Sequence, residues 1–190
     1  MKETPMSLGL ITLIVIIVFL IFWFVMIYNR FIRSKNVMRE AWSGIDVQLK
    51  RRHDLIPNLV ATVAGYMKYE RSVLEDITNL RSRSIGAGDI KEKAEAESAL
   101  TRSLKSLFAV AESYPDLKAN KSFLDLQSNL ANVEDQLQLA RRYFNGGVRD
   151  YNILVQSFPS VLLARIFNFE PAEFFELEEA SEREVPAIQL

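Results

Sequence analysis

The feature of this sequence that most limits how it can fold is an apolar run near its N-terminus. The run extends from Leu8 to Tyr28, contains 21 residues and carries no charged side chain. As an α-helix it would measure about 31 Å, which matches the hydrocarbon core of a lipid bilayer. A helix that is apolar on all faces has no stable place on the surface of a water-soluble domain. Residues 8–28 are therefore predicted to form a transmembrane helix.

A cleaved signal peptide is the alternative interpretation of such a run. Its basic N-terminal region would be weak here, because Lys2 is followed directly by Glu3. The apolar core of a signal peptide is about 7–15 residues long and is followed by small residues at the cleavage site. Asn29, Arg30 and Phe31 follow this run instead. The sequence therefore favours an uncleaved anchor.

The charges that flank the apolar run predict its orientation. Lys2 is the one basic residue before the run, whereas Arg30, Arg33, Lys35 and Arg39 follow it. Basic residues near the ends of a span remain on the cytoplasmic side of the membrane. We therefore expect a single-pass membrane protein. Residues 1–7 would form a short extracytoplasmic segment, and residues 29–169 a cytoplasmic domain.

Composition limits the partners and the chemistry of the domain. Residues 36–169 contain 18 basic and 16 acidic side chains, so the domain lacks the basic excess of a nucleic-acid-binding protein. The sequence has no cysteine, which excludes disulfides and thiolate ligands. We therefore expect no nucleic acid among its partners.

Three stretches of heptad-like spacing predict the fold of the domain. Apolar residues recur at steps of three and four over residues 38–80, 100–114 and 123–158. Such spacing places one apolar stripe along each helix, and the stripes bury one another most economically in an antiparallel bundle. The predicted fold is all-α. A transmembrane helix is followed by an elongated antiparallel bundle of three to four long helices.

Residues that start and stop helices divide the stretches. Pro57 lies inside the first stretch and is expected to kink or divide that helix, because proline lacks an amide donor. Gly147 falls on the seam of the third stretch, and close helix packing is favoured there over a hinge. The acidic tail, residues 170–190, is predicted to be weakly ordered, with Phe174 and Phe175 as candidates for docking. The first helix is expected to end at Ser84, Gly86 and Gly88. The predicted N-terminal caps of the next helices are Asp89, together with Glu92, and Asn120. The predicted helix stops are Pro115 and Pro159.

The sequence offers few residues for catalysis or for binding a metal. His53 is the one histidine, and its charged neighbours predict a solvated side chain. The carboxylates Glu112, Asp116, Glu134 and Asp135 lack the Glu-x-x-His repeats of dimetal bundles, and no phosphate-binding glycine motif occurs. We therefore expect a protein that is not an enzyme and holds no metal or cofactor. A hydrolase that depends on His53 is the competing hypothesis.

Arg52 interrupts the apolar stripe of the first stretch. A guanidinium buried without a partner is too costly to persist, so a buried Arg52 must reach an acid across the bundle. Glu134 and Asp135 are candidates by residue type. Alternatively, Arg52 extends its charged end to solvent along an apolar stem. Both interpretations stay open, and in either of them Arg52 fixes the register of the helices.

Several separated motifs resemble those of the LemA family, in the same order over roughly residues 28–170. Phe144-Asn145 stands where Tyr-Asn is expected, and the acidic tail lies outside the resemblance. The motifs are Trp42–Arg52, Asp54–Val60, Tyr114–Asn120 with Phe123, Leu126 and Gln127, Ala140–Tyr143, and Tyr151-Asn152.

This resemblance implies a bacterial protein of the inner membrane with one N-terminal span and a helical bundle, from a group associated with envelope maintenance and membrane proteolysis. The leading hypothesis is a membrane-anchored scaffold or adaptor that binds other proteins. Its partners would be the bilayer, further copies of the chain and an envelope protein such as a membrane protease. The alternative is a self-assembling protein that organises or remodels the membrane. The predicted partner or register surface consists of Trp42, Arg52, Asp54, Pro57 and Asn58.

Overall fold

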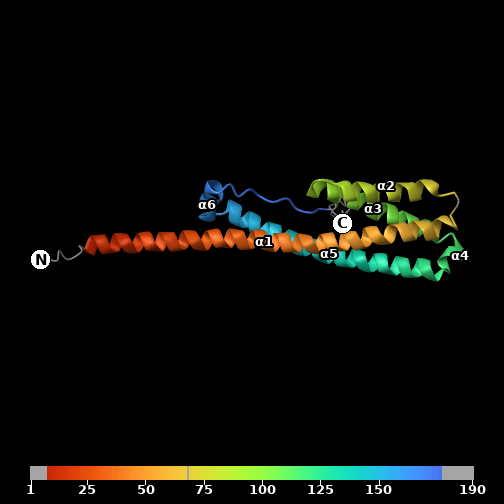
Figure 1. Ribbon diagram of the computed structural model, residues 1–190, viewed down its shortest axis with the longest axis horizontal. Coiled ribbons are helices and arrows are strands. Elements are labelled where there is room, and N and C mark those ends of the chain that lie inside the picture. Colours follow the sequence, from red (N-terminus) through yellow and green to blue (C-terminus); the bar gives the residue numbers. More distant parts are fainter. Residues whose placement is uncertain (1–7, 68, 177–190) are drawn as a thin grey trace, which may run out of the picture. The chain divides into compact units, whose positions relative to one another are not determined.

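The computed structural model describes residues 8–67 and 69–176, and these residues form helices connected by turns and short extended segments (Figure 1). The all-α prediction is confirmed. The helices are α1 (Leu8–Ala64), α2 (Arg71–Gly86), α3 (Ile90–Ala111), α4 (Pro115–Lys118), α5 (Lys121–Gln156) and α6 (Ser160–Ile166).

The chain forms two compact units, and each of the long helices α1 and α5 contributes to both. The first unit groups the chain up to Glu40 with Gly146–Ala172. The second unit groups Ala41–Asn145 with the chain from Glu173 onward. The two units are described separately below.

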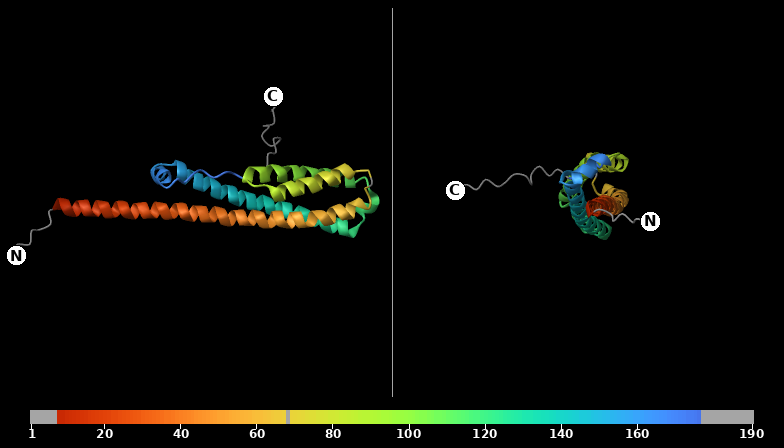
Figure 2. Two further views of the ribbon diagram at one scale, coloured as in Figure 1. Left: turned by 45° about the horizontal axis from the view of Figure 1, so that its top comes forward. Right: turned by 90° about the vertical axis from the view of Figure 1, so that its left-hand side faces the viewer.

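The second unit is a helical bundle whose core is built from the predicted apolar stripes. Side chains from α1, α2, α3 and α5 meet in one buried cluster, and Leu117 of α4 closes one end of it. Helices α2 and α3 pack side by side (Figure 2). The buried members are Ile56, Leu59, Val63, Met67, Leu74, Ile77, Leu100, Leu104, Leu107, Ala111, Leu117, Phe123 and Leu130.

One helix predicted from the sequence is two helices in the structure. The stripe over residues 38–80 predicts a single helix, but α1 ends at Ala64 and α2 begins at Arg71. Pro57, by contrast, does not divide α1, which continues through it to Ala64. The turn is held by hydrogen bonds to the residues that directly precede α4 and α5. There the Tyr114 hydroxyl donates to Glu70 (2.6 Å), and the Asn120 amide donates to the Tyr66 hydroxyl (2.9 Å).

The other predicted boundaries agree with the structure. Helix α2 ends at Gly86, and the Asp89 carboxylate accepts the amide of Glu92 at 2.6 Å as the N-terminal cap of α3. The Asn120 side chain caps α5 by accepting the amide of Phe123 at 3.1 Å. Helix α3 ends at Ala111 ahead of Pro115, and α5 ends at Gln156 ahead of Pro159.

The first unit contains the predicted membrane span. Among the described residues, α1 is the one helix that is long and apolar enough to cross a membrane, and none of its apolar window is buried within the structure. Beyond the span, Phe31 is fully buried and stacks on Phe169 with ring centroids 4.6 Å apart. A Cβ on Gly147 would lie 3.4 Å from Cγ of Met38, so this glycine faces α1 at van der Waals distance, and its packing role stays a prediction.

The acidic tail begins with a segment that packs on the helices. Residues 167–176 follow α6, and within this segment Phe175 is fully buried while Phe174 is exposed. The rest of the segment predicted to be weakly ordered, from residue 177, lies outside the described residues.

Candidate functional site

A buried polar cluster occupies one level of the second unit, centred on Arg52 of α1. Arg52 is 3% exposed, and its Nη1 lies 3.1 Å from Glu97 Oε2 and 3.3 Å from Glu134 Oε2. Its Nη2 donates to the Thr101 hydroxyl at 2.8 Å. The buried and paired alternative for Arg52 is therefore the one observed. Of the two predicted acids Glu134 is a partner, while the contacts to Glu97 and Thr101 were not predicted.

His53 belongs to the same cluster, so the predicted solvated histidine is wrong. The residue is 7% exposed, and its Nε2 lies 2.7 Å from Glu97 Oε1. The Ser84 hydroxyl of α2 donates to the same carboxylate oxygen. Since the hydroxyl and the imidazole both point at Glu97, the imidazole is not placed to take a proton from the serine. This geometry suits a structural role, in which the hydrogen bonds connect α1 and α2 to α3.

The environment of Glu97 keeps its carboxylate ionised. Burial alone would raise the pKa of Glu97, since removal from water penalises the charged form. The hydrogen bond with His53, the positive charge of Arg52 and the hydrogen bond from Ser84 together outweigh burial and hold the pKa below its ordinary value. The cluster thus places a negative charge opposite the Arg52 guanidinium in the core of the bundle.

Pro57 has a specific consequence one turn away. In a regular helix the amide of residue 57 would donate to the carbonyl of residue 53, but proline has no amide hydrogen. In this structure Arg81 of α2 donates its Nε hydrogen to the His53 carbonyl at 2.7 Å. The proline therefore leaves free an acceptor that α2 uses to dock on α1.

Trp42, another residue of the predicted surface, packs against other side chains of the second unit. Its ring meets those of Phe144 (5.2 Å between centroids) and Phe175 (5.5 Å) edge-on. The Lys93 ammonium lies 5.6 Å from the Trp42 ring centroid and 3.6 Å from the Asp46 carboxylate. This half-buried tryptophan therefore anchors the C-terminal segment and α3 to α1.

The remaining three residues of the predicted surface face solvent. Asp54, Pro57 and Asn58 are exposed, and their spacing of three and four places them together on the outer face of α1. Arg52, two residues before Asp54, points into the core instead. The structure therefore splits the predicted surface into a buried part and an exposed part. We call Asp54, Pro57 and Asn58 the α1 outer face.

Two asparagines that the sequence analysis did not single out as functional hold the C-terminal segment. In the second unit, Asn145 donates to the carbonyl of Phe175 (3.1 Å) and accepts its amide (2.9 Å). In the first unit, Asn152 does the same with Ala172, at 2.9 Å and 2.8 Å. Each asparagine replaces both hydrogen bonds that an extended backbone would otherwise exchange with a neighbouring strand. The seven-residue spacing of these asparagines along α5 is the signal that could have revealed them.

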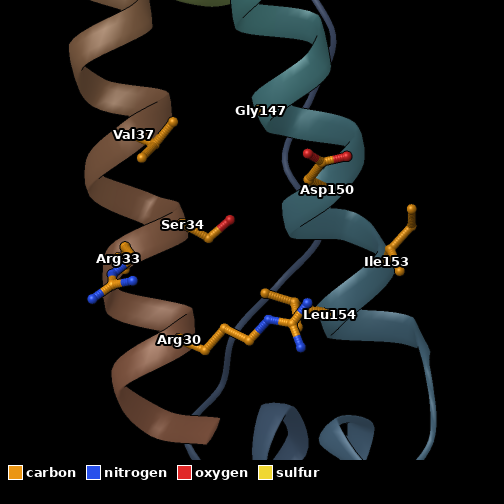
Figure 3. A pocket seen from close by; sticks show the side chains of 8 residues that line it. All are labelled: Arg30, Arg33, Ser34, Val37, Gly147, Asp150, Ile153 and Leu154. Atoms are coloured by element: carbon orange, nitrogen blue, oxygen red, sulfur yellow. The ribbon is translucent and has the colours of Figure 1, made fainter. Parts of the chain in front are cut away.

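The first unit contains a pocket of about 370 Å³ just beyond the predicted span. Figure 3 shows the Arg30 side chain reaching towards α5, while Arg33 turns away from it. The Ser34 hydroxyl and the Asp150 carboxylate face the space between α1 and α5 (Figure 3). Guanidinium, hydroxyl and carboxylate groups above an apolar floor suit a ligand that carries both polar and apolar parts. The described residues contain no group of three or more side chains placed to hold a metal ion.

Comparison with known proteins agrees with the resemblance noted in the sequence. A profile of the LemA family matches residues 41–190. The chain belongs to the LemA family. The match includes the C-terminal segment, so the expectation that the acidic tail lies outside the shared region is wrong. That segment carries Phe175, which packs against Trp42 within the LemA motif region.

Relatives of this LemA family member cover most of the chain. Protein LemA of Metamycoplasma hominis is 26% identical over 90% of this chain and 79% of its own length. Magnetosome protein MamQ 2 of Paramagnetospirillum magneticum is 24% identical over 100% of this chain and 82% of its own length. Magnetosome protein MamQ of Magnetospirillum gryphiswaldense is 23% identical, with coverages of 100% and 79%. Together with the apolar N-terminal helix, these similarities support a membrane-associated protein.

Proposed function

We propose that this LemA family protein is a membrane-anchored scaffold or adaptor that presents the α1 outer face to another protein of the bacterial envelope. The observation that best supports this proposal is the different burial of neighbouring motif residues. Arg52 is buried in the polar cluster, while Asp54, Pro57 and Asn58 remain exposed. No interaction ties the Asp54 side chain within the described residues. The outer face is thus available to a partner.

The chemistry of the α1 outer face defines the partner it would bind. Asp54 offers a carboxylate, Asn58 an amide and Pro57 a rigid apolar ring, all within about one helical turn. Such a small, mixed patch resembles part of a non-obligate interface, which is no more apolar than the rest of a protein surface. The buried polar cluster around Arg52 keeps the helices of the bundle in one register, so the α1 outer face is preformed before binding.

Crosslinking in intact membranes followed by mass spectrometry tests this proposal. The chain is compared with a variant that carries Asp54→Arg and Asn58→Arg. The matched control carries Asp125→Arg and Asn129→Arg, an equally spaced and exposed pair on α5. We expect crosslinks from the α1 outer face to an envelope protein, such as a membrane protease, that disappear only in the first variant. Equal loss in both variants, or none in either, would contradict the proposal.

A second candidate function is self-assembly to organise the membrane, and α5 offers one observation in its favour. Leu139 and Tyr143 are exposed large side chains one turn apart on that helix. Paired apolar side chains of this kind are suited to contacts between copies of a protein. In the same crosslinking experiment, contacts mainly between copies through Leu139 and Tyr143 would favour this candidate over the adaptor.

A further inference from the structure

Helix α6 of the first unit exposes apolar side chains to its surroundings. Leu163 and Ala164 are buried against the rest of the unit. Leu162 and Ile166, one turn apart, are 49% and 67% exposed, and Phe158 just before the helix is 81% exposed. The helix is therefore apolar on its inner side and on part of its outer side, which is unfavourable in water.

Ring contacts fix the level of α6 along the predicted span. Phe167, directly after the helix, lies 5.7 Å from Phe24 and 5.0 Å from Tyr28 between ring centroids. Both partners belong to the last turns of the apolar run that is predicted to cross the membrane. The C-terminal end of α6 therefore lies at the level of the last turns of the predicted span.

The direction of α6 agrees with a position at the membrane surface. Within the first unit, α6 runs across the axis of α1 and not along it (Figures 1 and 2). A helix that lies across a membrane-spanning helix lies close to the membrane plane. Arg165 is exposed on α6, and Arg30 follows Tyr28 by two residues, so basic groups are available at the level of the lipid phosphates.

We propose that α6, with Phe158 and Phe167, is a second membrane-contacting element, which lies in the interface of the leaflet on the domain side. Its occupant is the lipid bilayer. The apolar outer side chains enter the boundary between headgroups and acyl chains, as in other interfacial helices. The chain is then held by a span and by an interfacial helix, so the first unit cannot rotate freely about the axis of the span.

Spin labelling tests this proposal directly, because the chain contains no cysteine. Leu162→Cys and Ile166→Cys are introduced singly into the full-length chain, labelled with a nitroxide and reconstituted into liposomes. Val18→Cys, within the span, reports lipid exposure. Arg149→Cys, at an exposed position of α5 two residues after Gly147, is the aqueous control in the same unit. Circular dichroism of each variant checks that the helices are intact.

The readout is the ratio of label accessibility to oxygen, which concentrates in the bilayer, over accessibility to a water-soluble nickel chelate. We expect the ratio at residues 162 and 166 to approach that at residue 18 and to exceed that at residue 149 several-fold. A ratio equal to that at residue 149 would overturn the proposal. Low accessibility to both reagents would also overturn it, since protein, such as a second copy of the chain, would then cover α6.

Discussion

At the scale of single residues, the second unit depends on a charge that water cannot reach. Glu97 of α3 is fully buried, and its carboxylate is hydrogen-bonded to side chains of two other helices: Arg52 and His53 of α1 and Ser84 of α2. Burying an ionised carboxylate is costly, and only such partners offset the cost. We therefore expect the cluster to contribute specificity of helix register more than net stability.

Removing this charge should destabilise the bundle. Glu97→Gln leaves the Arg52 guanidinium buried with Glu134 as its remaining counter-charge. We expect the free energy of unfolding to fall by about 3 kcal/mol, near the lower end of the range for broken buried ion pairs because Glu134 persists. Chemical denaturation of the full chain in detergent, followed by circular dichroism, measures the change.

A neighbouring glutamate provides the control for this prediction. Glu95 lies on the same helix, is exposed and approaches Arg83 only to 3.9 Å. Glu95→Gln should change the free energy of unfolding by less than about 1 kcal/mol, as for other exposed pairs. Equal effects of the two substitutions would show that Glu97 is not a charge on which the core depends.

The residues of the cluster also show what the sequence could reveal about the site. Arg52 was identifiable because it interrupts an apolar stripe, and residue type offered Glu134 and Asp135 as candidate partners without deciding whether Arg52 is buried. His53 was mispredicted because its neighbours in the chain are charged, although on a helix adjacent residues point in different directions. Glu97 was overlooked, yet it lies three residues before Leu100, where the stripe of α3 would continue. A carboxylate at a seam position was the missing signal.

At the scale of elements, the sequence predicted the helices better than the turn between α1 and α2. The steps of three and four residues continue from Val63 in α1 to Val73 and Ile77 in α2. They continue because both helices direct these side chains into one core. Periodicity reports which side chains are buried and not the direction of the chain. The polar Glu70 interrupts the stripe and was the local sign of the turn. Its partner in the structure is Tyr114, which lies 44 residues away in the sequence and was not predictable from local spacing.

The docking of α2 on α1 should depend on Pro57 through the carbonyl that it leaves free. Arg81→Gln removes the charged donor to the His53 carbonyl and should cost about 1.5–3 kcal/mol of unfolding free energy. In a Pro57→Ala background the new amide can donate to the same carbonyl, so the same substitution should cost about 1 kcal/mol less. A double-mutant cycle by chemical denaturation measures this coupling. Strict additivity would mean that Arg81 does not compensate for the missing amide.

At the scale of the whole molecule, the distribution of charge relates the sequence to the membrane. Arg30, Arg33, Lys35 and Arg39 follow the apolar run, and all four side chains are exposed in the structure. Moving them through a bilayer would be costly, so we predict that they bias the chain towards the orientation in which the domain stays in the cytoplasm. None of the four belongs to the buried core, so changing them should affect topology more than stability.

The orientation can therefore be tested by labelling a single cysteine. Ser128→Cys, at an exposed position of α5, is treated with a membrane-impermeant maleimide in intact spheroplasts and again after lysis. We expect labelling only after lysis. Replacing the four basic residues by glutamine, with two lysines added before the apolar run, should raise labelling before lysis because the charge bias is then reversed. Labelling of the Ser128→Cys chain with its basic residues intact, in unlysed spheroplasts, would place the domain outside the cytoplasm and would redirect the search for its partner to the other side of the membrane.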